Sequence, residues 1–276
     1  MNLRTHTLDS EPGQYIESLI YYSDFEPDHS IERVVPTGNS YLIFELDGFV
    51  RNTFNNETLK PNASFTNVWF SGMHRNYISI SAHQKSEMFV VQFKPYGAHP
   101  FVYMPMQDLN DSVVPAEQLF GSEIFNLRDS LLNGSTPEKK FQIAEAWLND
   151  VYDRKKTPPE ELLDVVHRLQ RESVTNYGTI VGDYPKTHKH LIAQFKKYVG
   201  LTPKYYQRIM RFNEILQLIH RSKKIQWSQV AYQCEYSDQS HFIKEFKHFS
   251  GLNPQKFIAH DFNQEGENFF PLDRKG

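Results

Sequence analysis

The sequence contains a single cysteine, Cys234, among 276 residues. One cysteine excludes an intrachain disulfide and a metal cluster held by cysteines. The longest apolar runs span only a few residues, as in 88–91, whereas a membrane-spanning helix needs roughly 18 or more. The first 13 residues also lack the basic start and apolar core of a secretory signal. These absences predict a cytoplasmic chain that does not cross a membrane.

Charge is distributed unevenly along the chain, although the net charge is only −3. Residues 1–172 contain 15 Lys or Arg and 24 Asp or Glu, whereas residues 173–260 contain 13 and 5. A basic segment on an otherwise acidic protein favours a site for a polyanion such as nucleic acid. Segregation of charge between two domains without a functional reason is the alternative at this point.

The first 130 residues favour β-strands. Their short apolar runs end at turn signals, for example at 47–48, 71–72 and 95–97. This spacing is typical of a β sandwich or small barrel. Residues from about 116 to 170 favour helices, because apolar residues in 141–151 recur at helical spacing. A break at 154–159, with two prolines and three basic residues, is the best candidate for a connection between domains.

Residues 190–206 and 241–257 form an internal repeat. Seven of the 17 paired positions are identical at a constant offset of 51. A repeat of this length indicates two copies of one supersecondary unit. In each copy the apolar residues lie three and four positions apart, which places them on one helical face opposite a basic one.

Each copy also carries the signals that end one helix and begin another. Gly200 and Gly251 stand where a helix would end in a left-handed residue. A capping residue and a proline follow at 202–203 and again at 253–254, so a new helix is expected to begin at once. Residues 204–220 then form a long helix that joins the two units.

A short helix and a tight turn precede the second copy, and Ser237 or Asp238 is suited to cap the helix that follows. Helix, tight turn and helix with a basic outer face is the helix-turn-helix pattern. In the first copy, Ile180 and Val181 are the expected core of the upstream helix. In the short helix that precedes the second copy, the apolar face consists of Trp227, Val230, Ala231 and Cys234.

The stretch 230–254 resembles the C-terminal signature of AraC/XylS-type transcription regulators, and the resemblance extends over about 160–260. The front part is similar, more loosely, to an N-terminal β-rich domain of one branch of that family, through 33–44 and 93–97. The resemblance implies a sequence-specific DNA-binding transcription regulator with no enzymatic activity and no cofactor. Its two recognition helices would enter successive major grooves of double-stranded promoter DNA. RNA polymerase, a small-molecule effector and a second copy of the chain are further candidate partners.

The expected fold class is therefore α+β. A β-rich, barrel-like or sandwich-like regulatory domain covers 1–130, and a helical linker covers 131–158. An all-α domain with two helix-turn-helix units joined by a long helix covers 159–262, and a flexible tail covers 263–276.

Two positions depart from the family's pattern. Glu235 stands in the turn where glycine is usual, so the expectation is either a positive φ there at a cost of about 1 kcal/mol or a slightly different turn. Ala193 stands where the first recognition helix usually carries an arginine. The first unit is therefore expected to contribute mainly to phosphate binding, and the second to base recognition.

The candidate DNA contacts fall into two groups, because side chains that reach base edges give specificity and those that reach phosphates give affinity. The candidate base contacts are Lys189, Gln239, Ser240, His241 and Lys244. The candidate phosphate contacts are Lys186, Thr187, His190, Lys196, Lys197, Asp238 and Lys247.

The front domain leaves several functions open. Effector binding and dimerisation are the two that the resemblance implies. The alternative is a cupin-like small-molecule or metal-binding enzyme domain fused to the DNA-binding module, for which His74, His83 and His99 are the candidate ligands. Their spacing does not match that of a cupin metal site, so no metal is expected. The abundant aromatic residues of this part are expected to lie mainly in the core.

Overall fold

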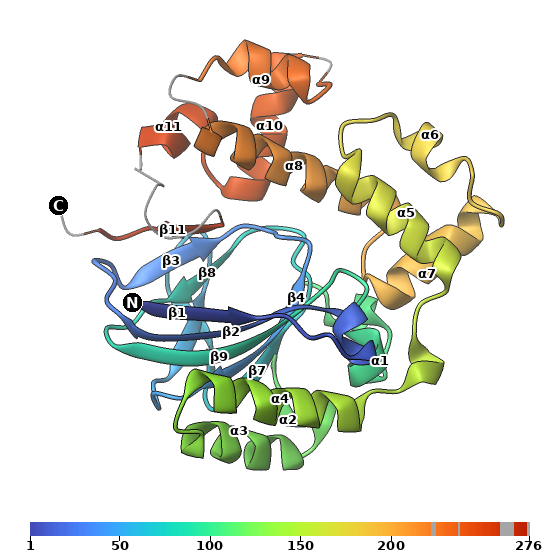
Figure 1. Ribbon diagram of the computed structural model, residues 1–276. Helices are drawn as coiled ribbons and strands as arrows, with labels where there is room; N and C mark the ends of the chain where they lie inside the picture. Colours follow the sequence, from blue (N-terminus) through green and yellow to red (C-terminus); the bar gives the residue numbers. More distant parts are fainter. Residues whose placement is uncertain (222–224, 237, 260–267, 275–276) are drawn as a thin grey trace.

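The computed structural model describes residues 1–221, 225–236, 238–259 and 268–274. A β-rich domain forms the lower half of the molecule in Figure 1, and a helical domain lies above it and to its right. The strands are β1 (Asn2–His6), β2 (Ile16–Phe25), β3 (Ile31–Val34), β4 (Ser40–Glu45), β5 (Arg51–Phe54), β6 (Pro61–Phe65), β7 (Val68–Ser71), β8 (Ile78–Ser81), β9 (Ser86–Phe93), β10 (Val113–Pro115) and β11 (Phe269–Pro271).

The strands form two antiparallel sheets. Within the described residues, sheet A has the order β1-β2-β9-β4-β7-β10 and sheet B the order β11-β3-β8-β5-β6. The pairing of β4 with β9 runs from Ser40 opposite Phe93 to Glu45 opposite Met88. Two sheets of short antiparallel strands confirm the β-rich, barrel-like or sandwich-like front domain.

The central strands of sheet A have one face in the hydrophobic core and one face toward the cavity. Along β4, Leu42 and Phe44 belong to the main hydrophobic core, whereas Tyr41 and Ile43 face the space between the two sheets. Because successive side chains of a strand point to opposite faces, this alternation gives each strand one face toward the helices and one toward the interior of the barrel.

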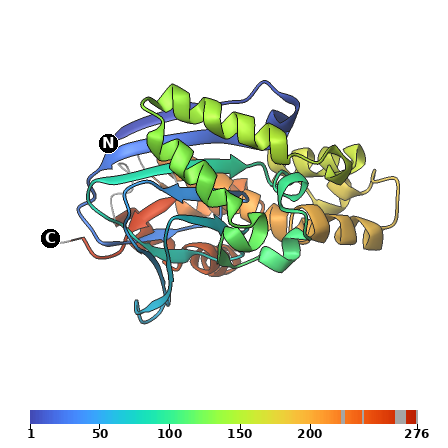
Figure 2. The same cartoon turned by 90° about the horizontal axis from the view of Figure 1, so that it is seen from below.

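The outer face of sheet A is covered by helices, as Figure 2 shows from below. Phe141 of α4 (Pro137–Val151) packs against Phe89 of β9, with ring centroids 5.8 Å apart. Arg128 of α3 (Glu123–Asn133) donates from Nε to the carbonyl of Glu45 at 2.8 Å. The expected linker 131–158 is therefore largely part of the front domain, because an amphipathic helix buries its apolar stripe on the nearest apolar face.

The connection between the domains is shorter than expected and runs from Tyr152 to Pro159, with one short 3₁₀ turn at Arg154–Lys156. Two small helices, α1 (His99–Val102) and α2 (Glu117–Phe120), complete the front domain. The helices of the second domain are α5 (Glu160–Arg171), α6 (Tyr177–Val181), α7 (His188–Tyr198), α8 (Pro203–Arg221), α9 (Trp227–Gln233), α10 (Gln239–Ser250) and α11 (Pro254–Ala259).

The second domain confirms the two helix-turn-helix units and the joining helix. The pairs α6–α7 and α9–α10 are the units, and the 19-residue α8 connects them. The caps follow the repeat: Thr202 accepts from the Tyr205 amide and Asn253 from the Lys256 amide. Asp238 caps α10 by accepting from the His241 amide at 2.8 Å, and Ser237, the other candidate, lies outside the described residues.

Left-handed residues lie at the expected positions of the repeat. Gly200 and Gly251 have φ values of 95° and 73°. Glu235, in the turn between α9 and α10, has a φ of 54°, which confirms the expectation for this non-glycine position.

The expected flexible tail is corrected in part. Phe269–Pro271 forms β11, which pairs antiparallel with β3 at the edge of sheet B. Unpaired amides and carbonyls on an edge strand readily accept another extended segment, and Phe270 is buried in the process. The partner strand of Phe269–Pro271 lies more than 200 positions earlier in the sequence, so no local sequence pattern predicts this pairing.

Replacement of Glu235 by glycine is expected to raise the free energy of unfolding by roughly 0.5–1 kcal/mol, because glycine adopts a positive φ without the steric penalty of a Cβ. Urea denaturation of the full chain measures the change. The matched control is Gln229→Gly at an exposed position within α9, where glycine should instead lower stability by roughly 0.5–1 kcal/mol. A loss of stability in Glu235→Gly would contradict the strain at this turn.

Candidate DNA interface and ligand pocket

The second recognition helix, α10, has one buried and one exposed face. Phe242, Phe246 and Phe249 are fully buried, and Phe246 packs on Phe212 of α8 with centroids 5.4 Å apart. The candidate base contacts lie on the opposite face near the N-terminal end of the helix. Those exposed residues are Gln239, Ser240, His241 and Lys244, followed by the candidate phosphate contact Lys247.

A buried carboxylate fixes the orientation of α10. Glu245 accepts from Nε of Arg208 on α8 at 3.2 Å and from the hydroxyl of Tyr236 in the turn at 3.2 Å. The ring of His241 lies 3.8 Å from the same carboxylate. Burial, assisted by Glu245, raises the pKa of the Tyr236 hydroxyl, which therefore stays protonated and acts as a donor. Sequence reasoning missed Glu245, because its partners lie on two other elements.

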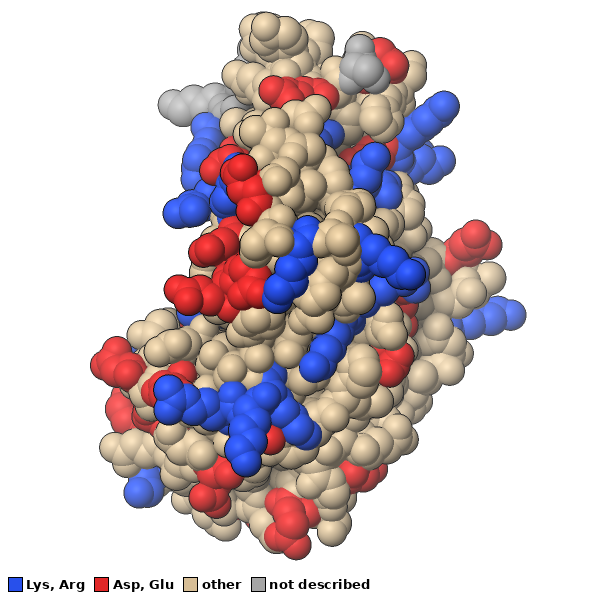
Figure 3. Space-filling model, turned by 90° about the vertical axis from the view of Figure 1, so that its right-hand side faces the viewer, with Lys and Arg blue, Asp and Glu red and all other residues tan. Residues whose placement is uncertain are grey.

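The first recognition helix, α7, exposes several cations. Lys189, Lys196 and Lys197 are exposed, as is Ala193, which stands where the family usually has arginine. Thr187 is occupied as the cap of α7, accepting from the His190 amide at 3.2 Å. Figure 3 shows the side of the molecule with this unit, where Lys and Arg side chains gather across the middle and lower part.

Two candidate phosphate contacts near α7 already have partners in the protein. Lys186 donates from Nζ to Glu161 of α5 at 2.5 Å, and this carboxylate raises the pKa of the lysine. His190 shares a hydrogen bond of 2.9 Å with the hydroxyl of Tyr184. A DNA phosphate would therefore compete with a carboxylate at Lys186, whereas Lys196 and Lys197 are exposed on α7.

A cavity of about 440 Å³ lies between sheets A and B. Its walls include aromatic and aliphatic side chains from both sheets, among them Tyr41 and Trp69 of sheet A and Ile78 and Ile80 of sheet B. Sequence reasoning assigned such aromatics to the core. Phe44 and Phe89 are indeed fully buried core residues, whereas Tyr41 and Trp69 line the cavity.

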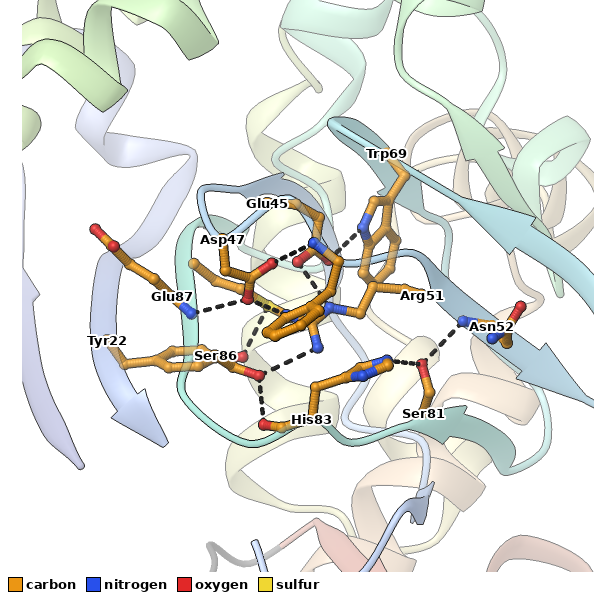
Figure 4. Close-up of polar contacts among 12 residues, drawn as sticks. Tyr22, Glu45, Asp47, Arg51, Asn52, Trp69, Ser81, His83, Ser86 and Glu87 are labelled. Atoms are coloured by element: carbon orange, nitrogen blue, oxygen red, sulfur yellow. Dashed lines mark hydrogen bonds and ion pairs between the residues drawn. The ribbon is translucent and has the colours of Figure 1, made fainter. Parts of the chain in front are cut away.

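An ion network closes one part of the cavity wall and joins the two sheets (Figure 4). Arg51 of β5 donates from Nε to Glu45 of β4 at 2.7 Å and from a terminal nitrogen to Asp47 at 2.5 Å. Glu45 also accepts from the indole nitrogen of Trp69 at 2.8 Å, and Arg51 donates to Ser86 at 3.1 Å.

Burial perturbs two titratable groups near this cavity in opposite directions. It lowers the pKa of His74 to about 4, against a smaller effect of Asp111, so this ring is neutral at physiological pH. It raises the pKa of Glu45 to about 7, although Arg51 and Trp69 act in the other direction. His74 bonds to the hydroxyl of Ser71 at 3.0 Å.

The three histidines considered as metal ligands do not converge. His74 bonds to Ser71, His83 to Ser81, and His99 to the carbonyl of Lys156 beside the helical domain. In the described parts of the chain, no group of three or more His, Cys, Asp or Glu side chains could hold a metal ion. No helix among those residues is long and apolar enough to span a membrane.

The contribution of His74 to stability is expected to fall as the pH drops from about 6.5 toward 4, because His74 is protonated in the unfolded chain before it is protonated in the folded one. His74→Gln should reduce this fall, by at most about 3 kcal/mol. Glu45 titrates in the same interval with the opposite sign, so the difference between the parent and the variant isolates the histidine. Urea denaturation at a series of pH values measures it. The control is His188→Gln on the exposed surface of α7, and equal pH profiles for His74→Gln and the parent would contradict the assignment.

Comparison with known proteins bears on both domains. Residues 186–260 match a family model described as a helix-turn-helix domain, and residues 13–115 match a domain of unknown function, DUF6597. No curated relative matches the chain.

Among solved structures, the chain is similar to ToxT from Vibrio cholerae. The P21 form is 12% identical and covers 94% of this chain and 98% of that one, with a TM-score of 0.46. ToxT from strain O395 is 13% identical, covers 87% and 96%, and has a TM-score of 0.45. Wild-type ToxT from strain SCE256, solved with an unsaturated fatty acid bound, is 12% identical, covers 88% and 96%, and has a TM-score of 0.46.

The assignment of the C-terminal domain depends on the family match over 186–260 together with two helix-turn-helix units, their capped recognition helices and the joining helix. The chain is therefore a DNA-binding transcription regulator with an AraC-type helix-turn-helix domain behind a β-rich front domain.

Proposed function

We propose that α7 and α10 enter successive major grooves on one face of double-stranded promoter DNA. The geometry requires recognition elements about 34 Å apart, one turn of the duplex. A helix of 19 residues is about 28 Å long, so α8 is a joining element of suitable length. Sequence-specific recognition by these two helices is the function that the geometry supports best.

The exposed N-terminal half of α10 is the observation that carries this proposal. Gln239 can bond an adenine through two amide contacts, and Lys244 can reach guanine. Ser240 and His241 complete the candidate base-reading set. The buried bonds of Glu245 hold this helix in place, which a reading helix needs because base contacts depend on sub-ångström placement.

The first unit is proposed to bind mainly phosphates. Lys189 is its candidate base contact, and the small exposed side chain of Ala193 has no group that can pair with a base. The remaining phosphate candidates of both units are those with exposed or helix-terminal positions. They are Lys186, Thr187, His190, Lys196, Lys197, Asp238 and Lys247.

We propose further that the front domain binds a small-molecule effector in the cavity between its sheets. A volume of about 440 Å³ with a largely apolar wall is typical of ligand sites in proteins. Dimerisation through the front domain, contact with RNA polymerase and a cytoplasmic location belong to the same hypothesis. No arrangement of catalytic or metal-binding side chains in the described cavity wall favours the enzymatic alternative.

Lys244→Ala is expected to weaken specific DNA binding by about 1–3 kcal/mol and to relax the preference at one base position. The matched control is Lys196→Ala on α7, which should weaken binding to all sequences alike and reduce the salt dependence of binding by about one phosphate contact. Selection from a random double-stranded library, followed by gel-shift titration of the selected sequences, measures both. If Lys244→Ala selected the same sequences with unchanged affinity, α10 would not be the reading helix in the proposed way.

A further inference from the structure

The charged side chains in the described wall of the cavity already have partners within the protein. Arg51 is the one Lys or Arg among the described residues that line it. Its guanidinium is bonded to two carboxylates, Glu45 and Asp47, and both oxygens of Glu45 have donors. The lining carboxylate Glu32 lies 3.4 Å from the buried ring of His29.

Several uncharged polar side chains of the wall also have partners. The hydroxyl of Tyr22 bonds to the sulfur of Met88, that of Tyr41 to Thr37, and the amide of Gln92 to Ser18. Six buried side-chain atoms of the described residues lack a partner, and none of them belongs to a residue that lines the cavity. They lie in Ser10, Arg33, Asn110, Tyr206, Arg211 and His220.

The histidines of the wall add no positive charge at physiological pH. Burial lowers the pKa of His74 to about 4 and also lowers the pKa of His83, which lies near the positive charge of Arg51. A ligand carboxylate would therefore find no Lys or Arg side chain in the described wall that is not already bonded to a carboxylate. A ligand ammonium would have to compete with Arg51 or His29 for a carboxylate.

We propose that the effector cavity takes an uncharged, largely apolar and aromatic ligand. A charged group moved into an apolar site without a partner loses its hydration without compensation, which excludes ionic ligands of the same shape. The rings of Tyr41, Phe65 and Trp69 supply apolar faces on which a flat ligand can stack. This inference rests on the proposed effector site and specifies its chemistry.

Three biphenyl probes of equal shape test the charge preference on the full chain at neutral pH. They are biphenyl-4-ylmethanol, biphenyl-4-carboxylate and biphenyl-4-ylmethylammonium, with binding measured by calorimetry. The alcohol is expected to bind, and the two ions roughly tenfold or more weakly. Ile80→Trp, which fills the cavity, should abolish binding of the alcohol, whereas Leu132→Trp on the exposed surface of α3 should not.

The outcomes separate the two hypotheses. If an ion bound as tightly as the alcohol and Ile80→Trp blocked it, the cavity would be a ligand site but the inferred ligand class would be wrong. If no probe bound, or if Ile80→Trp left binding unchanged, the effector site itself would be overturned. Glu45→Gln supplies a second test. It removes one negative partner of Arg51, so the variant should bind biphenyl-4-carboxylate more tightly than the parent does.

A separate observation concerns the tail at 268–274, which contacts both domains. Asp273 accepts from the backbone amides of Ser30 and Ile31 at 2.9 and 2.8 Å and from the Ser30 hydroxyl, which fixes β11 to the edge of sheet B. On its other side, buried Phe270 packs edge-on against Phe257 of α11, with centroids 4.8 Å apart.

The tail also meets the joining helix at the cavity wall. Asn268, a lining residue, donates to Oδ1 of Asn213 on α8 at 3.0 Å. The same Asn213 donates to the carbonyl of Pro36, another lining residue, at 3.1 Å. Figure 1 shows β11 lying between β3 and the helices of the second unit.

From these contacts we infer that the tail strand is a latch that holds the second helix-turn-helix unit against the front domain. Because Asn268 and Phe269 line the cavity, a ligand bound there would contact the latch directly. The latch thereby links the proposed effector site to α8 and α11.

Asp273→Ala tests the latch in the absence of DNA and ligand, so its result does not depend on the proposed effector. Amide hydrogen exchange of the full chain is expected to quicken at Leu272 and Val35, which bond across the β11–β3 edge, and in α11. Asp150→Ala, exposed at the end of α4, is the control. Faster exchange at Leu272 with α11 unchanged, or no change at Leu272, would overturn the latch. Phe270→Ala should quicken exchange in α11 even if Asp273→Ala folds poorly.

Discussion

The buried contact between Arg51 of sheet B and Glu45 of sheet A joins the two sheets of the front domain at one part of the cavity wall. Both side chains are almost fully buried, and each buried charge costs several kcal/mol to remove from water. Complete bonding by Asp47, Trp69 and Ser86 offsets that cost. The network thereby ties the sheets at one end while leaving apolar space between them. Two sheets joined only by aliphatic side chains would pack these chains closely and leave less space between the sheets.

The two faces of sheet A differ in what they contact: the outer face packs in the hydrophobic core, and the inner face lines the cavity. Sheet A gains most of its burial on its outer face, where Leu42, Phe44 and Phe89 pack beneath α4. Its inner face needs less packing for stability and lines the cavity instead. Core packing and the cavity wall are therefore on opposite faces of the same strands. Successive side chains of a strand point to opposite faces, so one strand can contribute to both.

The sequence predicts what is encoded locally. The repeat at an offset of 51, the glycines and capping residues after each recognition helix, and the positive φ at Glu235 all depend on residues within a few positions of each other, and the structure confirms them. The exposed face of α10 follows from helical spacing alone. The DNA contacts proposed for that face stay a prediction.

The features that the sequence did not reveal depend on residues far apart in the chain. The strand pairing of Phe269–Pro271 with β3, the docking of α3 and α4 on sheet A, and the clasp of Glu245 by Arg208 each join elements with no shared periodicity. The cavity was missed for a related reason. Tyr41 and Phe44 are both aromatic and near neighbours, and only the partner sheet decides which one faces the helices and which one faces open space.

The two domains share one hydrophobic core, and hydrogen bonds at its edge add specific contacts between them. Arg33 donates to the carbonyl of Ser250 at the end of α10, and Tyr205 to the carbonyl of Arg75. A hydrogen bond of this kind contributes about 1 kcal/mol net, and a switch of useful range needs a coupling of about 1–3 kcal/mol between its sites. Since α8 joins both units and its Asn213 bonds to two residues of the cavity wall, this helix connects the wall of the cavity with both helix-turn-helix units.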